Sequence, residues 1–105
     1  MDNDIIFTRG DTAQYTLELY DGEEPYILQD GDKLVFTVKE NVYTKEIVMQ
    51  KEVLNGQFTI DHKDTESLSY GDYVYDVQLT FANGDIQTVI KPTLFKLTEE
   101  VNFES

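Results

Sequence analysis

From Tyr73 to Phe81 every second residue is large and apolar, whereas most of the positions between them are polar. Alternation with a period of two places the two sets of side chains on opposite faces of a strand, so it predicts a half-buried β-strand. The run ends at Asn83-Gly84, a pair that suits a two-residue type I′ turn because both residues tolerate a positive φ. We therefore expect a β-hairpin in which Phe81 lies opposite Ile86.

The register set by this turn also pairs Val77 with Ile90, apolar with apolar. It places Asp76 opposite Lys91, so that an acid faces a base, and the agreement of these pairs favours the register. Pro92 lacks the N–H that a ladder needs, and it therefore predicts an end, an edge or a bulge in the returning strand.

Other short segments of alternating or apolar residues recur along the chain at a spacing of roughly ten residues. The expected strands lie within residues 5–8, 13–20, 34–39, 45–53 and 58–60, in addition to the hairpin, and residues 26–28 suit an edge strand or a strapped loop. The polar stretch between Asp61 and Leu68 predicts a turn or a single helical turn, with Asp61 or Thr65 as its cap. About seven to eight short strands in 105 residues predict one all-β domain, residues 1–105, built as an antiparallel sandwich or barrel.

The segment Leu68–Tyr75 has the outline of the tyrosine corner that begins strand F of immunoglobulin-like sandwiches. Tyr75 then takes the place where antibody domains carry a cysteine. The chain has no cysteine and no tryptophan, so such a sandwich depends on aliphatic and aromatic packing alone. An immunoglobulin-like antiparallel β-sandwich is the fold we expect.

Charge and composition exclude several functional classes. The net charge is −13, from 21 acidic and 8 basic residues, which opposes contact with a nucleic acid backbone and leaves a cationic partner surface possible. No apolar run approaches the ~20 residues of a membrane span, and the acidic N-terminus is unlike a signal peptide. We expect no nucleic acid, no membrane and synthesis in the cytoplasm.

Catalytic and metal-binding motifs are weak. His62 is the only histidine, and together with Asp64 and Ser67 or Ser69 it could form a nucleophile, base and acid, but no glycine-rich elbow accompanies them. The acid pairs Asp30/Asp32 and Glu23/Glu24 could bind calcium, yet they lack EF-hand spacing and fit solvated turns better. We expect no enzyme activity, no cofactor and no metal.

Two further patterns have alternative interpretations. Arg9-Gly10-Asp11 matches an integrin-recognition tripeptide, but a turn in which Gly10 gives the backbone freedom is the better interpretation. The tyrosines outside the inward alternation could stack on sugar rings or simply be scattered over the surface. They are Tyr20, Tyr26, Tyr43 and Tyr70.

Four stretches along the chain resemble the N-terminal domain of tailed-phage baseplate upper proteins. They are residues 6–12, 20–22, 31–38 and 70–77. The resemblance implies an immunoglobulin-like sandwich that docks onto the tail baseplate and carries the receptor-binding apparatus without enzyme activity. Unlike that family, this chain has no heptads or receptor-binding head after its last strand, so it is either a small phage or prophage structural protein or one domain of a longer one.

We therefore expect a noncatalytic structural or assembly module of a phage or prophage tail, located in the bacterial cytoplasm and then in the virion. Its partners would be tail or baseplate proteins, or a second copy of the chain, contacted through strand edges and loops. The expected interface residues are Tyr20, Glu23, Glu24, Pro25 and Tyr26. The alternative is an immunoglobulin-like module that binds a glycan or a cell surface.

Overall fold

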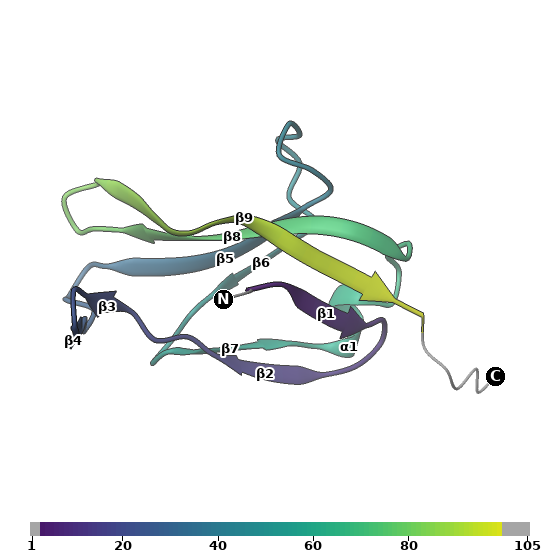
Figure 1. Cartoon of the computed structure of the whole chain (residues 1–105), viewed down its shortest axis with the longest axis horizontal. Coiled ribbons are helices and arrows are strands. Elements are labelled where there is room, and N and C mark those ends of the chain that lie inside the picture. The colour runs from purple at the N-terminus through teal and green to yellow at the C-terminus, as the bar shows by residue number, and fades with distance from the viewer. Residues whose placement is uncertain (1–2, 100–105) are drawn as a thin grey trace.

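The computed structural model describes residues 3–99, and its strands lie in two facing layers (Figure 1). The strands are β1 (Ile5–Thr8), β2 (Ala13–Thr16), β3 (Tyr20–Asp21), β4 (Glu24–Pro25), β5 (Lys33–Lys39), β6 (Met49–Glu52), β7 (Gln57–Ile60), β8 (Gly71–Thr80) and β9 (Ile86–Thr98), and the helical turn α1 spans His62–Thr65. This part of the chain is mostly β, as the sequence predicted. It divides into nine strands, where seven or eight were expected, because the short β3–β4 hairpin was not predicted. Residues 26–28 form no strand, in agreement with the strapped loop, one of the two structures expected for them.

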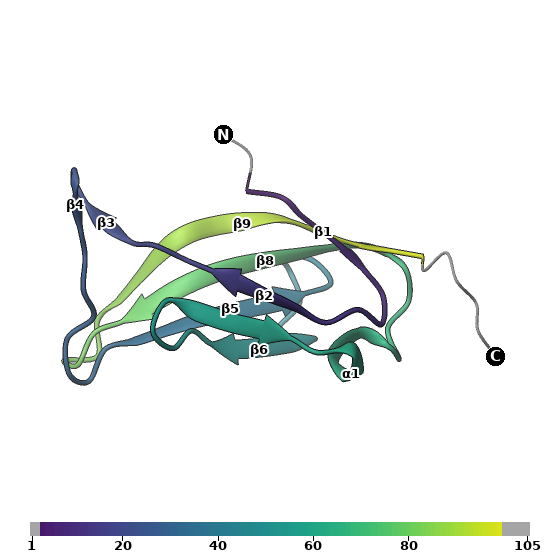
Figure 2. The ribbon, with the colours of Figure 1, turned by 90° about the horizontal axis from the view of Figure 1, so that it is seen from below.

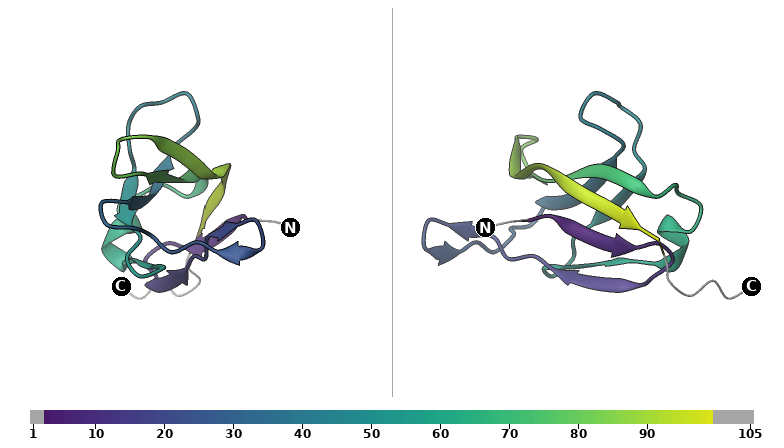
Figure 3. Two further views of the ribbon diagram at one scale, coloured as in Figure 1. Left: turned by 90° about the vertical axis from the view of Figure 1, so that its left-hand side faces the viewer. Right: turned by 45° about the vertical axis from the view of Figure 1, so that its right-hand side comes forward.

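The larger layer is a five-stranded sheet with the order β1-β9-β8-β5-β6, and it curls over the small β2–β7 sheet (Figure 3). Its pairs are antiparallel except that β1 runs parallel to β9, with Ile5 opposite Phe95. An entirely antiparallel arrangement was therefore a wrong expectation. The reason is that β1 turns at Arg9 and Gly10 into the other sheet, so its direction is set by that crossing and not by a hairpin with its neighbour.

The core lies between the two layers, and Phe36 occupies its centre. The Phe36 ring is fully buried and lies 4.5 Å from the Phe58 ring of the opposite sheet, between ring centroids. Its ring centroid also lies 5.2 Å from that of Tyr75 and 6.3 Å from that of Phe95, both in its own sheet. The alternating residues of β5 and β8 bury one face each, which confirms the period-two reading of both segments.

The β8–β9 turn differs from the predicted type I′ turn. Asn83 does not adopt a positive φ, and five residues, 81–85, separate Thr80 of β8 from Ile86 of β9. Gly84 has φ 95°, and its N–H donates to the Phe81 carbonyl over 2.9 Å. The Asp85 N–H donates to the Asn83 Oδ1 over 2.9 Å, which holds Asn83 in the alternative geometry. Ile86 consequently pairs with Thr80, so the predicted Phe81–Ile86 pair was wrong.

Further along this hairpin the predicted Val77–Ile90 pair is present. The next pair is Tyr75 with Thr93, so two residues of β9 oppose one of β8, and the predicted pairing of Asp76 with Lys91 is wrong. This bulge contains Pro92, which needs no ladder hydrogen bond there.

Two local predictions are confirmed near the start of β8 and at α1. The Tyr73 hydroxyl donates to the Ser69 carbonyl over 2.7 Å, the contact expected of a tyrosine corner. Asp61 precedes α1 as its N-cap, and its N–H donates to the Asp64 carboxylate over 2.7 Å.

One end of the molecule is built differently from the rest. Strand β2 ends at Thr16, and residues 17–20 continue as extended chain into the β3–β4 hairpin, beyond the small sheet (Figure 2). The β8–β9 turn lies at this same end, on the left in Figure 1. At this end the larger sheet is therefore covered by loops and the β3–β4 hairpin, and not by the β2–β7 sheet.

Candidate functional site

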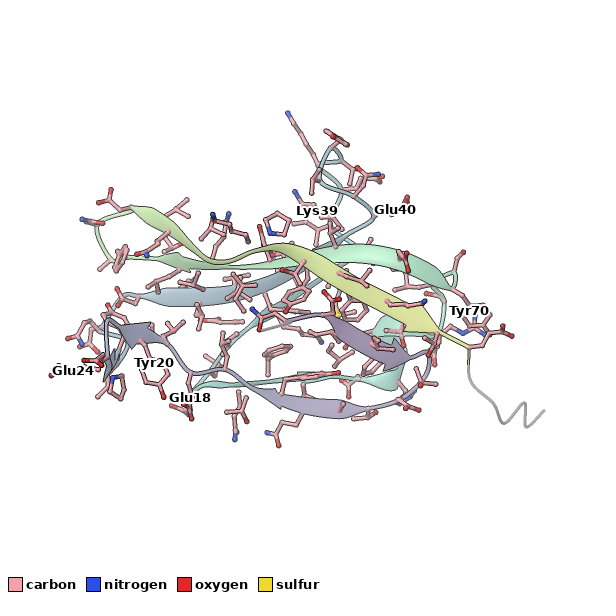
Figure 4. All side chains as sticks on the ribbon, viewed as in Figure 1. Glu18, Tyr20, Glu24, Lys39, Glu40 and Tyr70 are labelled. Atoms are coloured by element: carbon pink, nitrogen blue, oxygen red, sulfur yellow. The ribbon has the colours of Figure 1, made fainter. Side chains whose placement is uncertain are left out.

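The predicted interface residues lie together on and beside the β3–β4 hairpin. Tyr20 pairs with Pro25 across the hairpin, and Gly22, at φ 66°, forms its tip. The Tyr20 side chain is 58% exposed, and Glu23, Glu24 and Pro25 are exposed as well. Figure 4 shows Tyr20 and Glu24 at one extremity of the molecule. The hairpin thus presents an aromatic ring and carboxylates to solvent.

Tyr26, the fifth predicted residue, is partly buried and anchors the hairpin. Its hydroxyl donates to the Asp32 Oδ2 over 2.9 Å, and its N–H donates to the Leu19 carbonyl over 2.8 Å. Tyr26 therefore fixes both the segment before the hairpin and the loop after it.

Asp32 links the loop between β4 and β5 to the β8–β9 turn. Besides Tyr26, its carboxylate accepts hydrogen bonds from the Gln29 N–H over 2.9 Å and from the Ala82 N–H over 3.3 Å. These donors stabilise the charged form, and the Gln29 bond is the main reason that the Asp32 pKa lies below its ordinary value. The hairpin is thereby tied to the β8–β9 turn, 50 residues away in sequence.

A second tyrosine–carboxylate pair lies on the exposed side of the hairpin. The Tyr20 hydroxyl donates to the Glu18 Oε2 over 2.8 Å. This hydrogen bond, reinforced by the negative charge of Glu18, raises the pKa of Tyr20 above its ordinary value. The ring is held beside a carboxylate, which favours a cationic group as its neighbour.

Two open grooves flank residues 17–20. One has a volume of about 600 Å³ and lies between this segment and the β8–β9 hairpin; we name it the seam groove. Its apolar lining includes Leu19, Tyr26, Phe81, Val89 and Ile90. The other, about 610 Å³, lies between the same segment and the 55–56 turn.

The chain around the seam groove is acidic. Residues 17–32 contain six acidic residues, residues 79–90 contain one, and neither segment contains lysine or arginine. A groove lined by both apolar and polar side chains, between segments rich in acids, is suited to a ligand that is apolar and cationic at once.

Sequence reasoning missed the groove, although it named the hairpin. In its lining, Leu17, Leu19, Leu79 and Phe81 fit the alternation of their predicted strands and were therefore expected to be core. One signal in the sequence could have indicated the groove. The segment that contains Leu17 and Leu19 has several acidic residues and no basic one, which is unusual beside core positions.

Two of the possible catalytic residues, His62 and Asp64, have contacts with other parts of the fold. Asp64 caps α1 and lies 2.8 Å from the Lys51 Nζ, and the exposed His62 contacts Thr12 through its backbone N–H. No group of three or more His, Cys, Asp or Glu side chains that could hold a metal occurs within residues 3–99. In the acid pair Asp30/Asp32, Asp32 has the structural role described above.

The Arg9-Gly10-Asp11 tripeptide is a turn, as predicted. Gly10 has φ 87°, and its N–H donates to the Thr65 Oγ1 over 2.9 Å. The Arg9 guanidinium lies 4.3 Å above the centre of the Tyr70 ring. Arg9 is therefore held against its own fold in a cation–π contact.

The four tyrosines considered for sugar stacking do not share one face. Tyr20 lies at the hairpin end and Tyr70 lies at the opposite end (Figure 4). Tyr26 directly follows β4 of the hairpin. Tyr43, 92% exposed, belongs to the β5–β6 loop, which projects away from the sheets (Figure 1). A glycan site built from all four is therefore not assembled here, and a smaller one remains a prediction.

Within the described chain no helix is long and apolar enough to cross a membrane. Comparison with protein-family models gave no match, and comparison with curated proteins gave none either.

Proposed function

We propose that this protein is a noncatalytic structural module of a phage or prophage tail baseplate, which docks to neighbouring tail subunits through its β3–β4 hairpin. The tail context comes from the four sequence stretches described above. The observation that carries the docking role is the Tyr26–Asp32 hydrogen bond, which holds an exposed, acidic, aromatic hairpin in one position. A preorganised contact loses less conformational entropy on binding than a free loop does.

We further propose that the domain is an immunoglobulin-like sandwich. Three features support this: the Tyr73–Ser69 contact, the crossing of the chain from β1 to β2 between the two layers, and the facing of the five-stranded sheet by β2–β7. Such a sandwich leaves its strand edges and end loops available for contacts with other subunits.

Charge indicates the kind of surface that the hairpin meets. Glu18, Glu23 and Glu24 lie within four residues of Tyr20 in the sequence, and the whole chain carries −13. A basic partner surface is attracted by this charge, whereas a second copy of the chain is repelled. The module therefore favours assembly with a different subunit over self-association.

Isolated tail particles provide the test. Particles would be purified from an induced culture of the source cells and labelled with gold-conjugated antibody against this protein. The proposal expects label at the distal end of the tail. Absence of the protein from purified particles, shown by mass spectrometry, would contradict it.

A further inference from the structure

Two unpaired strand edges face each other across the seam groove. The first is the outer edge of β9. Strand β1 pairs only with Phe95–Thr98 of β9, so the described chain places no strand beside the preceding residues 86–94 on that side. The main-chain groups of such an edge are available to another strand.

The second edge belongs to residues 17–20. The Leu17 N–H donates to the Gly56 carbonyl over 2.7 Å, and the Leu19 carbonyl accepts from Tyr26. Because main-chain groups alternate in direction along an extended chain, those of Glu18 point the other way. They have no main-chain partner within residues 3–99.

Apolar side chains line the space between these edges. Val89 and Ile90 of β9 are partly buried, as are Leu19 and Phe81 opposite them. The groove volume of about 600 Å³ is large enough for several side chains. Its position continues the line of β1 along β9, where an added strand would extend the five-stranded sheet.

Resting on the tail-assembly function above, we propose that the seam groove receives an extended segment of a partner protein, in which apolar side chains alternate with lysine or arginine. The segment adds as a strand to the open edge of β9. Its apolar side chains enter the groove, and its cationic side chains meet the acids of residues 17–32 and Asp85. A second copy of this chain is excluded as occupant by the repulsion between two acidic surfaces.

A defined peptide tests the groove without any tail protein. The probe is a capped twelve-residue peptide of alternating lysine and valine, titrated into the ¹⁵N-labelled protein at physiological salt. A peptide of the same composition, with the lysines in one block and the valines in another, controls for charge alone. We expect the alternating peptide to shift the amide resonances of residues 17–20 and 86–90 and to slow hydrogen exchange at Glu18.

A pair of matched variants locates the site. Thr88→Lys places a positive charge on the exposed groove edge of β9, and Thr59→Lys makes the same change on the exposed face of β7. We expect Thr88→Lys to weaken peptide binding about fivefold, the size of a like-charge contact between paired strands, and Thr59→Lys to leave it nearly unchanged. Folding of each variant is checked by its amide spectrum.

The proposal is overturned if the two peptides bind equally, if the shifts spread over the acidic surface, or if both variants behave alike. Failure of the groove and failure of the tail function are distinguishable. Tail proteins recovered equally by wild type and Thr88→Lys, without binding of the alternating peptide, would overturn the groove alone. Peptide binding in the groove of a protein absent from tail particles would overturn the assignment to a tail partner.

Discussion

The Tyr26 hydroxyl donates a hydrogen bond to the Asp32 Oδ2 over 2.9 Å and thereby joins the end of the β3–β4 hairpin to the start of β5. The other oxygen of this carboxylate accepts from the Ala82 N–H in the β8–β9 turn. The loop between β4 and β5 and the β8–β9 turn, which are distant in sequence, thus share one anionic group. The proposed docking surface depends on this linkage.

Removing the hydroxyl tests the linkage directly. Tyr26→Phe keeps the ring and deletes the donor to Asp32, so we expect the free energy of unfolding to fall by about 1 kcal/mol, as for one hydrogen bond to a charged group at a part-buried site. The measurement is chemical denaturation at pH 7. Tyr43→Phe, at a 92% exposed position, is the control and should leave stability unchanged. Equal stabilities of the two variants would contradict the linkage.

The lowered pKa of Asp32 predicts an acid-dependent stability. An acid whose pKa is lower in the folded than in the unfolded state stabilises the fold at pH values above its ordinary pKa of 3.8. That contribution is lost as the pH falls from about 3.8 through the folded-state value. In Asp32→Asn we expect a lower stability at pH 7 and a shallower decrease between pH 4 and pH 2, measured by thermal unfolding across this range. An unchanged slope would contradict the role of the carboxylate.

For Asp76 we predict the opposite effect of the charged carboxylate on stability. Its partial burial on the five-stranded sheet raises its pKa, and the nearby Lys39 only partly offsets this. An acid with a raised folded-state pKa destabilises the fold when it is charged, so Asp76→Asn should raise the melting temperature at pH 7. This gain should vanish as the pH falls below 3.8. Asp72→Asn, an exposed position on the same strand, is the control. A lower melting temperature of Asp76→Asn at pH 7 would contradict the prediction.

Gly31 and Ala82 form a steric contact between the same loops. Gly31 has φ 90°, and a Cβ at this position would lie 2.7 Å from the Ala82 Cβ. We expect Gly31→Ala to cost about 1–3 kcal/mol from strain and overlap together. Gly22→Ala, with φ 66° and no neighbour within 4 Å, carries the strain alone and should cost less.

The double variant Gly31→Ala/Ala82→Gly separates these two contributions. Removing the Ala82 methyl group should recover the overlap part of the loss, and a double-mutant cycle by chemical denaturation measures this coupling. Strictly additive effects would show that the two loops do not meet in solution.

Local signals in the sequence predicted local features well. The alternation of β5 and β8 and the Asn55-Gly56 turn, where both residues have positive φ, follow from residue preferences alone. Asn83-Gly84 has the same two residues but forms a longer loop, because the following Asp85 N–H bonds to the Asn83 side chain. The dipeptide alone therefore did not determine the turn.

Features that depend on distant contacts could not be predicted in this way. The parallel pairing of β1 with β9 brings together residues about 90 positions apart, and the Asp32–Ala82 bond spans 50. The hairpin was identified as a candidate interface from its composition. The groove beside it lies between residues 17–20 and residues 87–90, which are far apart in the sequence, so no local pattern predicted it.

The most direct measurement is quantitative recovery of tail proteins from the source cells after prophage induction, with tagged protein as bait and mass spectrometry as readout. Three baits are compared: the wild type, the hairpin variant Glu23→Lys/Glu24→Lys, and the control Glu46→Lys/Glu66→Lys, which makes the same charge change at exposed positions outside the hairpin. The account predicts that baseplate or tail proteins are recovered by the wild type and the control and are strongly depleted with the hairpin variant. Equal recovery by all three baits, or no tail protein with any of them, would contradict it.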